Sequence, residues 1–110
     1  MQRALYRALA LDPQPDCVVI TGDLADHGAA EEYRVLHDIL DEFPLPLHLA
    51  IGSHDDRAAF IAAFAGTRYV NESARPSYAV DYLEATIVVL DSKDEHSAAG
   101  AGRLGQEQLD

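Results

Sequence analysis

Two short apolar runs in this chain each end in a glycine that is followed by acidic or imidazole side chains. The first run covers residues 18–23 and ends in Gly-Asp, and the second covers 47–55 and ends in Gly-Ser-His-Asp. A continuous apolar run of this length suits a strand that is buried on both faces of a parallel sheet. Since open α/β sheets bind ligands beyond the carboxyl ends of their strands, the pattern predicts an α/β fold with its chemistry at one sheet edge.

The segment between the two runs has the pattern of an amphipathic helix. Apolar residues recur there at three- and four-residue steps over about 29–42. With strands at 17–21 and 47–51, this helix completes a strand–helix–strand unit, whose two strands we expect to be parallel. Outside this unit we predict helices at 2–11 and about 56–64, an irregular segment at 65–76, an antiparallel hairpin of 77–82 and 86–90, a mobile polar loop at 92–103, and the start of a helix at 104–110.

The charge balance and the cysteine count exclude several classes of protein. The 110 residues include 8 basic and 19 acidic side chains, for a formal net charge of −11, which argues against nucleic acid as a partner. Cys17 is the single cysteine, so a disulfide framework is excluded, and we interpret it as a small buried side chain. No apolar stretch has the length of a transmembrane helix, and the first residues lack the apolar segment of a signal peptide. We therefore expect no membrane partner and a cytoplasmic location.

Asp23, at the exit of the first predicted strand, is the first candidate functional residue. Its two carboxylate oxygens are able to bridge two divalent cations. The same residue fits equally well as a cap of the following loop or helix. Spacing alone does not separate the two roles.

His54 and Asp55 follow the second predicted strand and form the second candidate group. A histidine at this place can donate a proton to a leaving oxygen, and an adjacent carboxylate can fix its tautomer. The alternative is a surface pair that caps the next helix. Neighbouring parallel strands would bring His54 to the same sheet edge as Asp23, which favours the functional interpretation.

Other polar residues are weaker candidates. Asp26 and His27 fit a solvated loop better than a supporting role beside Asp23, and Asp91 fits a turn as well as a buttress of the site. We interpret the remaining histidines as structural or solvated, because none has a partner at ligand spacing; they are His37, His48 and His96.

The order of these motifs resembles that of the calcineurin-like metallophosphoesterases, and most of all the bacterial branch of cyclic-nucleotide and glycerophosphodiester phosphodiesterases. The resemblance covers nearly the whole chain and rests on GDLADHG at 22–28, EEY at 31–33, GSHDD at 52–56 and LDS at 90–92. It implies a partial four-layer α/β/β/α sandwich. It also implies hydrolysis of phosphoric esters, with substrates such as 3′,5′-cyclic AMP or small glycerophosphodiesters.

The resemblance further implies a role for each motif residue. Asp23 would bridge two metal ions (Fe, Mn or Zn), and Ser53 stands where the family has a metal-ligating asparagine. His54 would act on the leaving group or transition state, and Asp55 would orient it. In the family, a metal-bound hydroxide attacks phosphorus in line.

The family's opening Asp-x-His motif, which should stand upstream of the helix at 2–11, and its closing Gly-His-x-His motif, which should follow the helix that begins near 104, are not present at those places. We therefore interpret residues 1–110 as a single partial metallophosphoesterase domain, which alone has weak activity or none. The alternatives are a non-catalytic binding or regulatory remnant of the same fold, which Ser53 favours, and an unrelated α/β protein in which Asp23 and His54 are accidental caps. An unpaired edge of the parallel sheet also predicts a marginal fold or a homo-oligomer formed by edge pairing.

Overall fold

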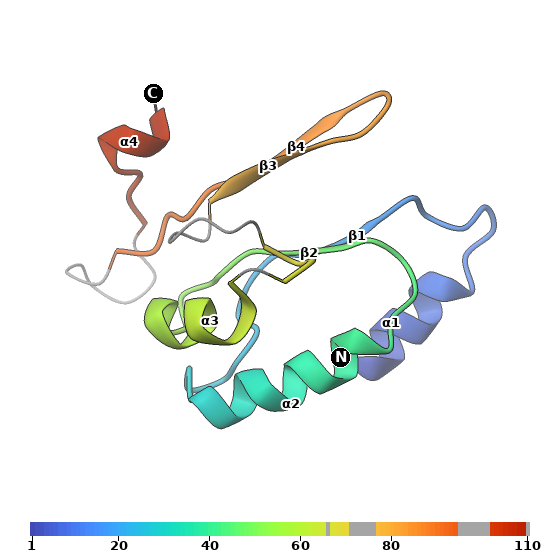
Figure 1. The fold of residues 1–110 in the computed structure, drawn as a ribbon, viewed down its shortest axis with the longest axis horizontal. Coiled ribbons are helices and arrows are strands. Elements are labelled where there is room, and N and C mark those ends of the chain that lie inside the picture. Colours follow the sequence, from blue (N-terminus) through green and yellow to red (C-terminus); the bar gives the residue numbers. More distant parts are fainter. Residues whose placement is uncertain (66, 71–76, 95–101, 110) are drawn as a thin grey trace.

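The fold is known from a computed structural model, which describes residues 1–65, 67–70, 77–94 and 102–109 (Figure 1). Helices and strands alternate through most of the chain, as the sequence predicts. The elements are α1 (Gln2–Leu9), β1 (Val18–Ile20), α2 (Ala30–Asp41), β2 (Leu47–Leu49), α3 (Arg57–Phe64), β3 (Tyr78–Asp81), β4 (Thr86–Val89) and α4 (Gln106–Leu109).

The predicted strand–helix–strand unit is confirmed. β1 and β2 pair in parallel, with Val18 opposite Leu47 and Ile20 opposite Leu49, and α2 forms the connection between them. Both strands are shorter than the apolar runs that predict them. The first ends early because Gly22 has φ +119° and Asp23 has φ +50°, so the backbone leaves the extended conformation there.

The predicted antiparallel hairpin is also confirmed and forms a second sheet. β3 pairs with β4, and Tyr78 lies opposite Val89. In Figure 1 the hairpin lies on one side of β1–β2, while α2 and α3 lie on the other side. The Tyr78 hydroxyl donates a 2.6 Å hydrogen bond to the Leu49 carbonyl and so fastens the hairpin to β2. The described elements therefore form part of an α/β sandwich.

An aromatic cluster holds α3 against α2. The Tyr33 ring packs edge-on against Phe60 and Phe64, with centroids 6.2 and 6.3 Å apart, and all three side chains are fully buried. The sequence predicts that Phe60, Ile61 and Phe64 face inward, and Ile61 is only partly buried. The Tyr33 hydroxyl bonds to Asp55 and to the Asp56 N–H, so this cluster is tied to the loop that follows β2.

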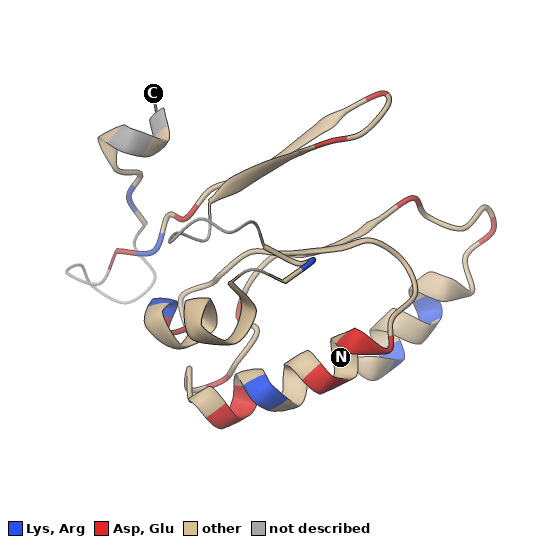
Figure 2. Ribbon diagram, in the orientation of Figure 1, with Lys and Arg blue, Asp and Glu red and all other residues tan. Residues whose placement is uncertain are grey.

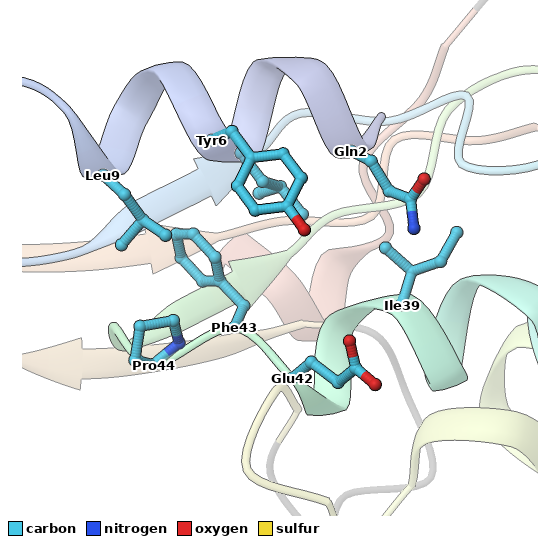
Figure 3. A pocket seen from close by; sticks show the side chains of 8 residues that line it. Gln2, Tyr6, Leu9, Ile39, Glu42, Phe43 and Pro44 are labelled. Atoms are coloured by element: carbon cyan, nitrogen blue, oxygen red, sulfur yellow. The ribbon is translucent and has the colours of Figure 1, made fainter.

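The N-terminal helix α1 lies beside the C-terminal end of α2. Side chains of α1 and of the C-terminal end of α2, among them Leu9, Ile39 and Phe43, line a small pocket of about 50 Å³ (Figure 3).

In the predicted loop at 92–103, Lys93 pairs with Gly102, whereas 95–101 lie outside the described residues, as do 66 and 71–76 of the predicted irregular segment. Asp and Glu outnumber Lys and Arg on α2 (Figure 2). No helix in the described ranges is long and apolar enough to cross a membrane.

Candidate functional site

The loops after β1 and β2 meet at Asp23 and Gly52. A Cβ added to Gly52 would lie 2.3 Å from the backbone nitrogen and from Oδ1 of Asp23, so a side chain at position 52 would displace the carboxylate. Asp23 itself has φ +50°, a conformation that residues other than glycine rarely adopt. Its Oδ1 accepts a 3.0 Å hydrogen bond from the His54 backbone N–H. The structure therefore brings the two predicted candidates to the same sheet edge.

Asp55 is the structural centre of this edge. Its side chain is fully buried, and its carboxylate accepts hydrogen bonds from four donors. The donors are Leu24 N at 3.1 Å, Ala25 N at 3.0 Å, Gly52 N at 2.7 Å and the Tyr33 hydroxyl at 2.9 Å. Because both oxygens already bond to these groups, Asp55 holds the two loops together. In the described structure its carboxylate makes no hydrogen bond to the His54 ring, so the predicted orienting contact between the two residues is not present.

The hydroxyl of Tyr33 joins α2 to the hydrogen-bond network around Asp55. It donates to Asp55 Oδ1 and accepts a 2.9 Å hydrogen bond from the Asp56 backbone N–H. Burial, together with the hydrogen bond to Asp55, raises the pKa of Tyr33 above its usual value, so the phenol stays protonated and remains a donor. The apolar pattern of the helix predicts the position of this ring and gives no signal for the role of its hydroxyl.

The His54 ring has a different partner from the predicted one. Its Nδ1 lies 3.1 Å from the backbone carbonyl of Asp26 and 3.8 Å from the Asp26 carboxylate. A carbonyl only accepts hydrogen bonds, so Nδ1 carries the proton in this contact. In neutral His54 the other nitrogen, Nε2, is then unprotonated, and no described residue bonds to it. Asp26 thus supports the histidine through its backbone.

Glu32 organises the loop that contains Asp26. Its carboxylate accepts hydrogen bonds from the backbone N–H groups of Asp26 at 2.7 Å, His27 at 3.2 Å and Ala29 at 3.2 Å. Partial desolvation opposes ionisation of Glu32, but the three N–H donors outweigh it and lower its pKa. A glutamate three residues after a helix N-cap is a known start signal, and this signal could have identified the contact with Ala29 from sequence.

An ion pair between Arg57 and Asp91 lies next to the hydrogen-bond network around Asp55 and is linked to it through Lys93. Asp91, at the end of β4, accepts from Arg57 Nε at 2.5 Å and from an Arg57 terminal nitrogen at 3.2 Å. Arg57 also donates to the Lys93 carbonyl, and the Lys93 ammonium donates to the Asp55 carbonyl. This arrangement fits the buttress that the sequence left as one of two alternatives for Asp91.

Two further histidines, His37 and His48, bond within the fold, whereas the His27 ring is exposed. His48 Nε2 lies 2.6 Å from the Tyr82 hydroxyl, and burial lowers the pKa of His48. His37 stacks on Phe64, and its Nδ1 lies 3.1 Å from the Asp41 carboxylate. His96 lies outside the described residues.

The oxygens at this edge do not amount to a metal site. Asp23 Oδ2 has no partner among the described residues. Ser53, which stands between Gly52 and His54 in the chain, is exposed. In the described part of the chain, no three His, Cys, Asp or Glu side chains are grouped closely enough to hold an ion. Metal centres of the transition series need several such ligands. The residues present therefore do not fit a metal ion by themselves.

Comparison with known proteins gives consistent results. The family model described as calcineurin-like phosphoesterase matches residues 2–103. The chain is 34% identical, over 99% of its length, to a probable cyclic nucleotide phosphodiesterase of Rhodopseudomonas palustris. It is 32% identical, over 82% of its length, to a glycerophosphodiester phosphodiesterase of Enterobacter lignolyticus, and 27% identical, over 99%, to a probable one of Arcobacter nitrofigilis. The matched regions span 39%, 33% and 41% of these three relatives, respectively.

Proposed function

Because this chain belongs to the calcineurin-like phosphoesterase family, we propose that it forms part of the active site of a phosphodiesterase. The proposed substrates are small phosphodiesters, either cyclic nucleotides such as 3′,5′-cyclic AMP or glycerophosphodiesters. Relatives that bear both names support this substrate class. The family generally uses a dinuclear metal site, which would hold Fe, Mn or Zn.

One observation carries the proposal. The Asp23 carboxylate and the His54 backbone, which come from different strands, are joined by a 3.0 Å hydrogen bond at the carboxyl edge of the parallel pair. Asp23 Oδ2 and His54 Nε2 are both left without a partner in the described structure. One carboxylate oxygen and one ring nitrogen are therefore available to a ligand at the same edge.

These atoms define the proposed roles. His54 Nε2, when protonated, donates to a phosphoryl oxygen or to the leaving oxygen of the ester. Asp23 and Ser53 would contribute oxygens to the metal site of the family. Asp55 is assigned a positioning role, because its oxygens already accept four hydrogen bonds. Since the described residues lack a complete ligand set, no reaction step through a metal is derived from this chain.

A chimera tests the proposal. Residues 2–103 replace the matching segment of the Enterobacter relative, and hydrolysis of bis(p-nitrophenyl) phosphate is measured with added Mn²⁺. We expect turnover that Asp23→Asn and His54→Gln each reduce by at least tenfold, while Glu84→Gln, in the hairpin turn, has no effect. Turnover that is equal in all variants would contradict the assigned roles.

The unmodified chain tests a separate point. We propose that it has weak activity or none on bis(p-nitrophenyl) phosphate and cyclic AMP, because its described residues contain no group of three His, Cys, Asp or Glu side chains that could hold a metal ion. Robust turnover by the chain would overturn this view, and the chimera result would be unaffected.

A non-catalytic remnant of the same fold is the second candidate, and Ser53 favours it. A serine hydroxyl reaches less far than the amide carbonyl of asparagine. If the chimera is inactive and Ser53→Asn restores hydrolysis, the serine is the cause of the lost activity and the remnant interpretation is supported. A cytoplasmic location, edge-paired oligomers and the absence of nucleic-acid and membrane partners stay predictions of the sequence.

A further inference from the structure

We propose that Glu32 is a positioning residue that fixes the tautomer of His54 by holding the peptide bond between Asp26 and His27. The inference rests on the proposed function in one respect: with one proton held on Nδ1, the ring takes up and releases the catalytic proton at Nε2, the atom assigned to the leaving oxygen. The structural link itself depends only on contacts within this chain.

The first step is the grip of Glu32 on the loop. Both carboxylate oxygens contact the His27 N–H, at 3.2 and 3.3 Å, and Oε2 also accepts from Asp26 N at 2.7 Å. Glu32 lies in the first turn of α2, whose rigid backbone continues to Tyr33 and the aromatic cluster beneath the site. The loop is thus tied to the helix by a carboxylate rather than by weak contacts with solvent.

The second step follows from the geometry of one peptide unit. The His27 N–H that bonds to Glu32 and the Asp26 carbonyl that bonds to His54 Nδ1 belong to the same planar group. In a trans peptide the N–H and the C=O point in opposite directions. When Glu32 holds the N–H on one side, the carbonyl is therefore aimed to the other side, toward the imidazole.

The third step is electrostatic. A carboxylate that accepts from the N–H polarises the peptide, which makes its carbonyl a stronger acceptor. The carbonyl then favours the neutral ring with its proton on Nδ1, which leaves the lone pair on Nε2. Free imidazole side chains prefer the opposite tautomer, so the bound form requires an external partner of this kind.

One rival partner lies close by. The Asp26 carboxylate is 3.8 Å from His54 Nδ1, and both Asp26 and the His27 ring are exposed. At 3.8 Å this carboxylate is too distant for a hydrogen bond, whereas the carbonyl is within range at 3.1 Å. We therefore assign the tautomer to the backbone, and the Asp26 side chain provides a direct comparison.

The experiment reads the tautomer by NMR. Long-range proton–nitrogen spectra of the uniformly ¹⁵N-labelled chain are recorded above the pH at which imidazoles titrate, and His54 is assigned by its loss in His54→Gln. We expect the Nδ1–H tautomer in the parent chain. In Glu32→Gln, which keeps one accepting oxygen and loses the other, we expect a shift toward Nε2–H.

Two variants serve as controls. Glu31→Gln changes the neighbouring glutamate, which pairs with Arg34 on the exposed side of the helix, and should leave the tautomer unchanged. Asp26→Asn removes the rival carboxylate, keeps the carbonyl, and should also leave it unchanged. An Nε2–H tautomer in the parent overturns the inference even if Glu32→Gln does not fold, and so does a Glu32→Gln spectrum identical to the parent's.

The outcome is distinguishable from a failure of the proposed function. If the His54 tautomer changes in Glu32→Gln but the chimera hydrolyses no phosphodiester, the positioning role of Glu32 stands and the proposed function is refuted. If the tautomer is the same in Glu32→Gln and the parent but the chimera is active, the proposed function stands and the positioning role is refuted.

Discussion

Removing the hydroxyl of Tyr33 should lower the free energy of unfolding of the whole fold, although the substitution deletes only one oxygen atom. The phenol donates to the buried Asp55 carboxylate and accepts from the Asp56 N–H, at 2.9 Å in each case. In Tyr33→Phe the ring keeps its packing against Phe60 and Phe64, so the apolar contribution of the core is retained. The difference between the two proteins therefore reports on the two hydrogen bonds.

The expected magnitude follows from the burial of these groups. A hydrogen bond to a charged acceptor is worth about 1.5–3 kcal/mol. The Asp56 N–H is only partly buried, so water can replace the lost phenol and its loss adds about 1 kcal/mol at most. Because Asp55 keeps three other donors and can relax, we expect a loss of about 3 kcal/mol in the free energy of unfolding. For a chain of this size, that loss lowers Tm by about 10 °C or more.

Chemical and thermal unfolding followed by circular dichroism measure this change. Tyr6→Phe is the matched control, because the Tyr6 side chain is 69% exposed, and it should behave like the parent. If Tyr33→Phe stays within about 0.5 kcal/mol of the parent, as ordinary surface substitutions do, the hydroxyl does not couple α2 to the site loops and the reasoning fails.

Three further predictions concern the same region and its neighbour sheet. Asp55→Asn should cost at least about 3 kcal/mol in unfolding experiments, because the amide offers one accepting oxygen to four donors; a smaller loss than in Tyr33→Phe would contradict the shared network. Gly52→Ala should shift the backbone resonances of Asp23 and His54, since the new Cβ would lie 2.3 Å from Asp23 N, and unchanged amide spectra would refute this close approach. Burial lowers the pKa of His48, so His48 contributes stability above its unfolded pKa of about 6.5, and this contribution is lost as pH falls through the lower folded value. Urea titrations across about pH 7.5 to 5 should therefore show less acid destabilisation in His48→Gln than in the parent.

The sequence was sufficient for the arrangement of elements, because that arrangement follows from local patterns. The strand–helix–strand unit and the hairpin are confirmed, and the Asp23 and His54 motifs do meet at one edge. What the sequence missed are contacts made across long intervals. Neighbouring positions suggested that Asp55 orients His54, but the loops turn Asp55 inward, toward donors that include the hydroxyl of Tyr33.

The same limit explains the other partners. Glu32 and Asp26 lie six residues apart, and their contact passes through a loop whose turn includes Gly28 at φ +70°. Arg57 and Asp91 are 34 residues apart, and only the packing of α3 beside the end of β4 brings them together. No periodicity in the sequence specifies such pairs, because each forms only when the helices, strands and loops have packed against one another.

The Asp55 carboxylate also bears on the order in which this protein folds. Its donors lie 3, 22, 30 and 31 residues away along the chain, so no single segment can complete the set. Contacts over such separations form only after the entropy of closing the intervening loops has been paid. The candidate site therefore cannot be pre-assembled in a partly folded chain: it comes into existence in the same step that commits α2 and the two strand exits to each other, and its integrity reports that step.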